Sequence, residues 1–487
     1  MAEPSLKADS RRKLIPLLAA FMILLLLLKV PLPDSLLHLE GAPLTAPGRA
    51  TLAVLAFCLV LWMTEPLPFH ITGLFGMIML ALLGTESFAN IVSSGFGNDT
   101  IVFFIGVLVI SSCIGQSGLG SRISTLLLSL TGNRTKYILL GFLVVSALFG
   151  MWITTLAAAA VLTPLALSVA KREELQPGSS RFGKGLFIAV AWGSLLGGPA
   201  TPAGSGANPL LIGFVRDLLN IEISFTDWML FGIPATLVML LPAWFLLLFF
   251  FPPEKKTISR TREELKLEYK NLPPMSRNEK SSLFIFCLTI LLWLVSKPLG
   301  ALVGIRIPTS MPALLGACLF FFPGVTDMKW KKIQDDVSWS GILLIASGVS
   351  LGLLMYTTGA AKWIATLLLS DIGRMAPVMQ ILSVILIVSV LKLGLSSNTV
   401  TATVTVPILI ALAGQQNITP LAVVIPAAMT MNVAYILVTS TPTTVIPYTT
   451  GYFSISDMAK PGIIMTLVSA AVLTPVIYLI GRLGGIF

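Results

Sequence analysis

Charged residues are scarce in this sequence. Asp, Glu, Lys and Arg make up 11% of its 487 residues, whereas about a quarter of the residues of a soluble domain are charged. Hydrophobic residues make up 55%. Many uncharged segments are longer than a buried helix requires, which excludes one very large water-soluble core. The chain is therefore expected to lie mostly inside a membrane.

Histidine and cysteine are also rare. His38 and His70 are too few and too far apart for a metal cluster, and the cysteines lie in apolar runs without paired spacing. We interpret the cysteines as packing residues rather than metal ligands or disulfide partners. They are Cys58, Cys113, Cys287 and Cys318.

Sequence motifs for chemistry are missing as well. No Walker sequence occurs, which argues against an ATP-driven pump, and no nucleophile has a base near it in a recognisable motif. A channel requires rings of like residues or one continuous polar stripe, whereas the polar residues here gather in paired places. A membrane-embedded enzyme or a channel is therefore only a distant alternative, and we expect no catalytic residues.

Long apolar runs are what the sequence has in abundance. Examples are Leu14–Leu28, Leu230–Phe251 and Gly462–Leu479, and together the runs give about ten to twelve spans of about 20 residues. The alternation of a β-barrel is absent, so the spans are predicted to be helices. The first run follows Arg11, Arg12 and Lys13 but precedes no small-residue cleavage site, so we interpret it as the first span.

The basic residues predict the orientation in the membrane. Four of them lie before the first span, and eight lie in Pro252–Lys280. Short basic segments face the cytoplasm, so we expect the N-terminus and Pro252–Lys280 inside and the C-terminus outside. The net charge of +10 then reflects topology and contact with anionic membrane lipid, and it gives no support to nucleic-acid binding.

Two halves of the sequence resemble each other. Val145–Pro164 matches Val388–Pro407 at a constant offset, since 407 − 164 = 243. A second block beginning at Ser117 matches one at Thr358 with an offset of 241, and the block at Thr201 resembles that at Thr439. Three blocks in the same order indicate an internal repeat, and an odd number of spans per half makes the halves inverted.

Polar residues gather at two places in each half. These interruptions are Thr154–Pro164 and Gly197–Asn208 in the first half, and Ser396–Pro407 and Thr439–Thr450 in the second. Irregular backbone at membrane depth is tolerated where it lines a cavity, so corresponding interruptions indicate a binding site. Helix N-termini with Ser, Thr and Asn donors suit an anion, and carbonyls at helix ends suit a cation.

One of these interruptions resembles a known family. "SSNTVTATVTVP" at Ser396–Pro407 is similar to the Ser-Asn-Thr signature of the divalent anion/sodium symporter family, which transports dicarboxylates, citrate and sulfate. Further similar stretches begin at Met63, Ile110, Gly197 and Thr439, so the resemblance spans nearly the whole chain.

The resemblance implies a fold. It is an all-α polytopic membrane protein with about 11 transmembrane helices and two re-entrant hairpins, in two inverted repeats with scaffold and transport domains. The implied parts are an N-terminal arm and first helix (1–49), a first repeat (50–251; hairpin about 136–171, broken helix about 185–218), a cytoplasmic linker (252–281) and a second repeat (282–487; hairpin about 376–415, broken helix about 419–452).

The resemblance also implies site residues. Ser397, Asn398 and Thr399 complete the signature, while the first half has Thr154, Thr155 and Leu156 in its place. The substrate-binding residues are then expected to be Thr154, Thr155, Ser397, Asn398, Thr399, Thr441 and Lys392. Sodium is expected near Thr154, Thr155, Gly198, Gly204, Asn208, Ser397, Asn398, Thr439 and Thr444. Hydroxyls in membrane helices also bond to their own helix, an alternative reading for Thr401, Thr403 and Thr405.

Lys392 stands out because it lies in an apolar run, five residues before Ser397, where the other half has Phe149. An ionisable group at membrane depth is costly unless it snorkels, pairs or faces a watery cavity. One alternative is snorkelling to the headgroups. Another is that the ammonium group lies near the anion site, or takes the place of one bound Na⁺.

Secondary active transport of a small divalent anion, most simply a di- or tricarboxylate, agrees best with these features. The resemblance implies Na⁺ as coupling ion, an elevator-type mechanism and a homodimer in the plasma (inner) membrane. Two alternatives of the same fold remain open: a Na⁺-independent anion exchanger, and a transporter of sulfate or organosulfonates.

Overall fold

The computed structural model describes residues 6–259, 267 and 270–486, and these residues form helices joined by short loops. The described residues contain no strand, only an isolated bridge between Arg134 and Thr257. Ten of their helices are long and apolar enough to cross a membrane, and three apolar helices are shorter. The predicted all-α polytopic fold is confirmed.

The helices of the first half are α1 (Leu6–Lys29), α2 (Asp34–Leu37), α3 (Ala46–Thr64), α4 (Phe69–Leu82), α5 (Phe88–Phe96), α6 (Asp99–Ser117), α7 (Leu119–Leu130), α8 (Thr135–Ile153), α9 (Thr155–Arg172), α10 (Arg181–Gly197), η1 (Gly198–Ala200), α11 (Ala207–Leu219) and α12 (Phe225–Phe250).

Those of the second half are α14 (Arg277–Val303), α15 (Ser310–Leu319), α16 (Trp330–Asp336), α17 (Trp339–Thr357), α18 (Ala360–Leu369), η2 (Ser370–Arg374), α19 (Pro377–Gly394), α20 (Asn398–Gln416), α21 (Pro420–Thr430), η3 (Val438–Ser440), α22 (Pro442–Tyr448) and α23 (Ile455–Leu483).

The three longest helices begin in the same way. In each, a serine before the helix accepts a hydrogen bond from the backbone N–H three residues later, and the acidic side chain there bonds back to the N–H of the serine. This capping box satisfies two backbone N–H groups that the helix leaves unpaired. The pairs are Ser224 with Asp227 (α12), Ser276 with Glu279 (α14) and Ser454 with Asp457 (α23).

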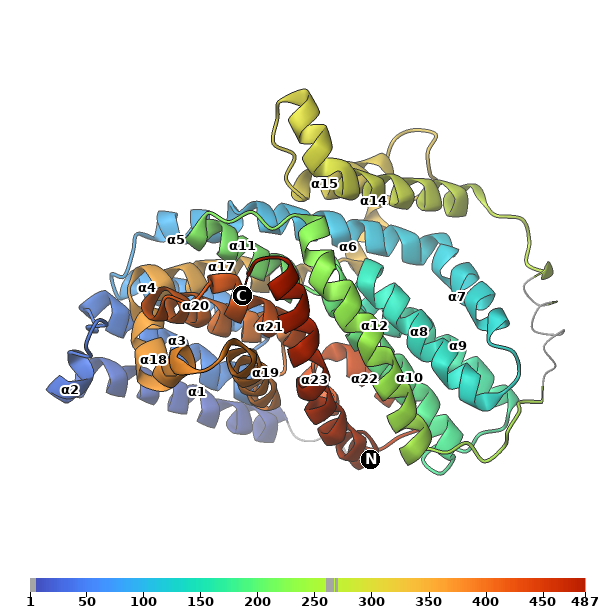
Figure 1. Ribbon diagram of the computed structural model, residues 1–487, viewed down its shortest axis with the longest axis horizontal. Helices are drawn as coiled ribbons and strands as arrows, with labels where there is room; N and C mark the ends of the chain where they lie inside the picture. Colours follow the sequence, from blue (N-terminus) through green and yellow to red (C-terminus); the bar gives the residue numbers. More distant parts are fainter. Residues whose placement is uncertain (1–5, 260–266, 268–269, 487) are drawn as a thin grey trace.

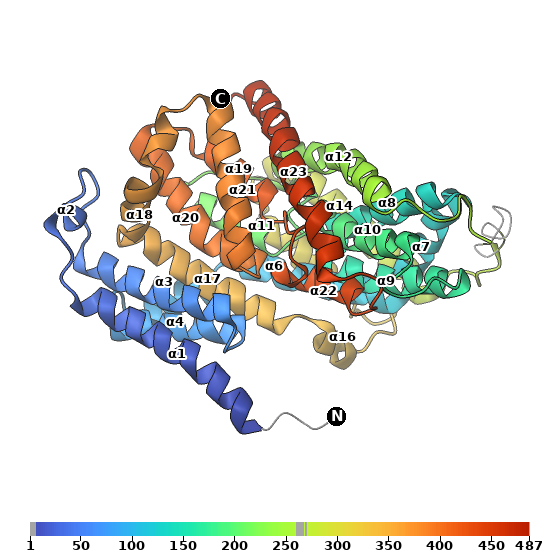
Figure 2. The ribbon, with the colours of Figure 1, turned by 90° about the horizontal axis from the view of Figure 1, so that it is seen from below.

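The interrupted helices lie in the middle of the molecule. Helices α1, α3 and α4 lie together at one end of its long axis, and α7 to α10 lie at the other (Figures 1 and 2). Between them, α20 packs against α11 and α17, while α22 packs against α9 and α10. Helices of the two halves therefore interleave at the centre.

The sequence repeat is visible in the local geometry. Gly118 ends α6 with φ 85°, and Gly359 precedes α18 with φ 82°, at the predicted offset of 359 − 118 = 241. The Thr154 side chain accepts a hydrogen bond from the Ala157 N–H, and the Ser397 side chain accepts one from the Val400 N–H. These two caps are 397 − 154 = 243 residues apart, so corresponding residues cap the corresponding helix in each half.

The basic turns of the first half gather with the start of the linker. The Thr135 N–H donates to the Lys256 carbonyl (3.1 Å), and the Ser259 N–H donates to the Glu173 carboxylate (3.0 Å). Burial tends to raise the pKa of Glu254, but hydrogen bonds, among them those from the N–H groups of Phe182 and Arg181, bring it below its usual range. Linker residues 260–266 and 268–269 lie outside the described residues.

The packing interpretation of the cysteines is half right. Cys58 and Cys113 are buried, as expected. Cys287 and Cys318 are exposed, because each lies on a side of its helix that the chain itself does not cover. Apolar context alone does not distinguish these two faces of a membrane helix.

Glycines bring α8 and α10 into close contact. A Cβ atom on Gly193 would lie 2.4 Å from the Leu143 carbonyl oxygen, and one on Gly197 would lie 2.1 Å from that of Ala147. Both distances are far below van der Waals contact, so these positions accept only glycine without a backbone shift. Small residues allow helices in membranes to approach each other closely.

Gly193→Ala is therefore expected to destabilise the protein by about 1–3 kcal/mol, because the added methyl group overpacks the α8–α10 contact. Thermal unfolding of the purified protein in detergent measures the effect. Gly115→Ala in α6 is the matched control, since a Cβ atom there has nothing within 4 Å. Equal unfolding temperatures for the two variants would show that the contact yields without cost.

Candidate functional site

The first-half hairpin turns at Thr154, between α8 and α9. Its backbone has φ 77° and ψ 148°, a conformation that a β-branched residue rarely adopts. The strained turn allows Thr155 to begin α9 while its N–H donates to the Gly204 carbonyl (3.0 Å). The hairpin turn is thus joined to the interruption between α10 and α11.

That interruption is held by Asn208, which is buried. Its Nδ2 donates to the carbonyls of Gly198 and Thr201, both at 2.8 Å. Its Oδ1 has no hydrogen-bond partner among the described residues. A buried acceptor without a partner is costly, so this oxygen is suited to receive a ligand.

At the second-half hairpin, two asparagine side chains are hydrogen-bonded to each other. Ser397 caps α20, and the Nδ2 of Asn398 donates to the Oδ1 of Asn432 (2.7 Å). Asn432 is 1% exposed, and its Nδ2 has no partner among the described residues. The second half therefore has a spare donor, whereas the first half has the spare acceptor of Asn208.

Lys392 is hydrogen-bonded to the first of these two amides. It is 1% exposed, so the snorkelling alternative is wrong: the side chain does not reach a surface of the chain. Its Nζ donates to the Oδ1 of Asn398 (2.8 Å) and to the carbonyls of Leu395 and Ser440 (3.4 Å each). The lysine thus connects the hairpin turn to the interruption between α21 and α22.

Lys392 also sets the direction of the hydrogen-bond chain. An ammonium group can only donate, so Asn398 must turn its Oδ1 toward Lys392 and its Nδ2 toward Asn432. Asn432 must then accept with its Oδ1, which leaves its Nδ2 as the spare donor. The ammonium group thereby fixes the orientation of both amides, and the site is left with an N–H group of Asn432 as a donor.

The two halves meet at this cluster. The Thr443 hydroxyl donates to that of Thr155 (3.1 Å). A Cβ atom on Gly198 would lie 2.7 Å from the Asn432 Oδ1 and 2.8 Å from the Thr155 Cγ2, so the glycine lies in direct contact with both. One on Gly206 would lie 3.2 Å from the Thr399 hydroxyl. The structure thus brings signature residues of both halves to one place.

Two of the expected residues make hydrogen bonds within their own loop, and a third is exposed. Thr441 caps α22 by accepting from the Thr443 N–H (3.4 Å), and the Thr444 hydroxyl donates to the carbonyls of Val438 and Thr441 (2.6 and 2.7 Å). Thr439 is exposed, unlike its neighbours in the chain. The side chains of Thr441 and Thr444 shape the loop, whose carbonyls remain candidates for a cation.

The alternative reading holds for the hydroxyls inside α20. Thr401, Thr403 and Thr405 each donate to the carbonyl four residues earlier, at 2.9, 3.0 and 2.7 Å. Leu156, which stands where the signature has its third polar residue, is 39% exposed.

Asn432 and Thr443 were not identified from the sequence. Asn432 lies inside the apolar stretch Leu421–Val438, and a lone amide at such a place is a signal that could have been used. Thr443 belongs to the Thr439–Thr450 interruption but differs in no visible way from the threonines beside it. Only packing distinguishes it.

The cluster suits an anion. Helices α9 and α20 both begin here, and helix N-termini offer unpaired N–H groups and the positive end of a dipole. Hydroxyls of Thr155 and Thr399 and the amide of Asn432 add neutral donors. The Lys392 ammonium group, which is hydrogen-bonded to Asn398, contributes positive charge beside the cluster.

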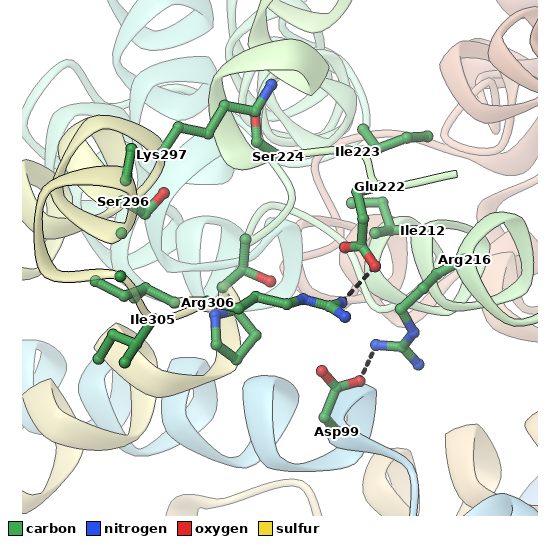
Figure 3. A pocket seen from close by; sticks show the side chains of 16 residues that line it. Asp99, Ile212, Arg216, Glu222, Ile223, Ser224, Ser296, Lys297, Ile305 and Arg306 are labelled. Carbon is green, nitrogen blue, oxygen red and sulfur yellow. Dashed lines mark hydrogen bonds and ion pairs between the residues drawn. The ribbon is translucent and has the colours of Figure 1, made fainter. Parts of the chain in front are cut away.

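A pocket of about 510 Å³ lies elsewhere, between α6, α11 and the loop after α14 (Figure 3). Its cations are paired: Arg216 contacts Asp99 and Asp217, and Arg306 contacts Glu222. Because these charges are neutralised, the pocket attracts an anion weakly. The ion pair between Arg216 and Asp99 instead fastens α11 to α6.

Comparison with known proteins covers nearly the whole chain. Residues 11–484 match the model of the family described as the sodium:sulfate symporter transmembrane region. The sodium-dependent dicarboxylate transporter SdcS of Staphylococcus saprophyticus is 29% identical over 460 residues, which cover 91% of this chain and 88% of that protein. SdcS of Staphylococcus aureus strain USA300 has the same identity and coverage.

Two solved structures are similar in fold. The MtrF structure from Neisseria gonorrhoeae aligns with a TM-score of 0.57 and 16% identity over 94% of each chain. The YdaH transporter of Alcanivorax borkumensis aligns with a TM-score of 0.55 and 15% identity, over 80% of this chain and 88% of that one. At such identities the similarity concerns the fold alone.

Asn398→Ala is expected to lower the stability of the protein by about 2 kcal/mol, because hydrogen bonds to charged groups contribute about 1.5–3 kcal/mol and the buried Lys392 loses its nearest acceptor. Thr155→Ala is expected to cost about 1 kcal/mol, since it removes one bond between neutral hydroxyls. Thermal unfolding in detergent compares the two variants. An equal loss in both would show that the ammonium does not depend on Asn398.

Proposed function

The chain belongs to the sodium:sulfate symporter family, and from this membership we propose that it carries small divalent anions, with dicarboxylates as the preferred class, across a membrane together with Na⁺. The members of this family are transporters and not enzymes. The dicarboxylate preference is supported by relatives that are named sodium-dependent dicarboxylate transporters. Sulfate is the second candidate, because the family description names it.

The observation that carries the proposal is the meeting of the two halves. The beginning of α9 is joined to α22 by the hydrogen bond between Thr443 and Thr155, and the beginning of α20 is joined to the loop after α21 by that between Asn398 and Asn432. Gly198 lies in contact with both Asn432 and Thr155. Two helix N-termini with neutral donors match a ligand with two negative groups. One carboxylate is proposed to bind at the Thr154–Thr155 turn and the other at Ser397–Thr399.

Sodium has a suitable place in the first half. The Oδ1 of Asn208 is buried and has no partner among the described residues, and it lies in the interruption whose carbonyls include Gly198 and Gly204. Carbonyl and amide oxygens at unwound helices are the ligands that transporters of this type offer to Na⁺. We propose that Na⁺ binds there and that anion binding depends on it through Thr155.

The transport movement is proposed to be of the elevator type. The hairpin α8–α9 packs against α10 and α22, and the hairpin helix α20 packs against α11 and α21. These contacts favour movement of both hairpins and both broken helices as one transport domain. The remaining helices are proposed to form the scaffold, with the two halves as inverted repeats within the boundaries predicted from the sequence.

The scaffold is also where a partner copy and lipid are proposed to bind. Helices α12 and α14 expose large apolar side chains, among them Phe245, Phe249 and Phe284. Such faces suit lipid tails or a second copy of the chain, which supports a homodimer in the plasma (inner) membrane. Residues 134–136, 171–184 and 252–259 gather at one end, which supports a cytoplasmic location for that end.

Proteoliposomes that contain the purified protein test the function. An inward Na⁺ gradient is expected to drive accumulation of radiolabelled succinate, and replacing Na⁺ by choline is expected to abolish it. Asn398→Ala is expected to reduce the initial rate at least tenfold, since a donor set that recognises oxygen is broken. Uptake that ignores Na⁺ but accelerates with succinate inside the vesicles would identify an exchanger instead.

Cysteine labelling tests the orientation. In a background without Cys58, Cys113, Cys287 and Cys318, Lys256→Cys is expected to react with an impermeant maleimide only after the cells are opened. Leu483→Cys, at a position that is 82% exposed, is expected to react in intact cells. Labelling of both positions from the same side would contradict the proposed topology.

A further inference from the structure

We propose that the ammonium group of Lys392 occupies a cation position in the second half of the chain, so that this half needs no Na⁺ of its own. The inference rests on the proposed function, because it specifies how many Na⁺ ions accompany each anion. It begins from a lysine that is among the largest fully buried side chains of the described residues.

The surroundings of the Lys392 Nζ resemble those of a bound cation. Its three oxygen neighbours come from two segments: the Leu395 carbonyl and the Asn398 Oδ1 belong to the hairpin turn, and the Ser440 carbonyl lies between α21 and α22. An ammonium group has three protons and here donates all three. Carbonyls at helix interruptions with a side-chain oxygen are also a typical donor set for Na⁺.

The helix geometry favours positive charge at this point. Lys392 lies in the last turn of α19, where the unpaired carbonyls form the negative end of the helix dipole. All three oxygen neighbours belong to neutral groups, so they solvate the ammonium group without cancelling its charge. The net positive charge therefore remains available to a bound anion at the adjoining start of α20.

The first half has no tethered cation at the matching position. The repeat offset places Phe149 opposite Lys392, since 392 − 243 = 149, and Phe149 is buried. The Asn208 Oδ1 in that half still has no partner among the described residues. Of two related cation positions, the chain thus fills one with its own side chain and leaves the other for an ion.

This asymmetry has a consequence for charge. A dicarboxylate with two negative charges is neutralised by Lys392 together with a single Na⁺, and a neutral assembly crosses the membrane at the lowest electrostatic cost. Without Lys392, two Na⁺ ions would be needed. The empty site keeps the lysine charge, so exchange of internal for external anion is expected to be faster than net uptake.

The coupling ratio tests the inference directly. Succinate gradients that just balance a known Na⁺ gradient at zero membrane voltage give the number of Na⁺ ions per succinate. We expect one for the wild type and two for Lys392→Gln, because the vacated oxygens become free to bind Na⁺. Lys362→Gln, at an exposed lysine of α18, is the matched control and is expected to keep a ratio of one.

A second measurement does not require transport. The unfolding temperature of the purified protein in NaCl is compared with that in choline chloride at equal ionic strength, without succinate. Na⁺ is expected to raise it more in Lys392→Gln than in the wild type or Lys362→Gln. If wild-type vesicles transport no succinate while this difference is present, the proposed function fails and the cation role of Lys392 stands.

Two outcomes would overturn the inference. One is a wild-type ratio of two or more Na⁺ per succinate, which can be measured even if Lys392→Gln does not fold. The other is an unfolding temperature of Lys392→Gln that responds to Na⁺ no more than that of the wild type. In either case Lys392 would serve only to orient Asn398.

Discussion

Four helix interruptions lie inside an apolar molecule, and their polar groups have to find partners without bulk water. Unpaired backbone groups in such surroundings cost several kcal/mol each, so interruptions persist only where they satisfy one another or line a cavity. Here they satisfy one another: Thr155 bonds to Gly204 within the first half, Lys392 bonds to Ser440 within the second, and Thr443 bonds to Thr155 between the halves. The rest of the fold holds these four interruptions together.

Different polar groups complete the corresponding sites of the two halves. The first half has a strained Thr154 turn and a buried amide whose oxygen has no partner among the described residues. The second has a lysine and an amide pair that present a donor. Two related halves can therefore differ in how they supply positive charge, since a single substitution, Lys392 where the other half has Phe149, places a fixed cation in one of them.

Glycine makes this close arrangement possible. Gly193 and Gly197 allow α8 to approach α10, and Gly198 allows Asn432 to reach the neighbourhood of Thr155. Side chains at Gly193 and Gly197 would force α8 away from α10, and a side chain at Gly198 would overlap Asn432 and Thr155. The site therefore depends on the close packing of the helix backbones.

Sequence alone determined the features that depend on local composition and period. Apolar runs defined the spans, constant offsets of 241 and 243 defined the repeat, and Gly, Ser and Thr clusters marked the interruptions. The burial of Lys392 near the signature was one of the alternatives that the sequence left open. Helix length, capping and interruption are set by neighbours in the chain, which is why a pattern predicts them.

Tertiary structure alone decided which groups meet. It brought Asn432 and Thr443 into the cluster, left Thr439 exposed, used Thr444 to hold the loop, and exposed Cys287 and Cys318. It also set the donor direction from Lys392 through Asn398, because an amide can face either way until a neighbour that only donates fixes it. Contacts between residues more than 200 positions apart depend on packing in three dimensions, about which local sequence carries no signal.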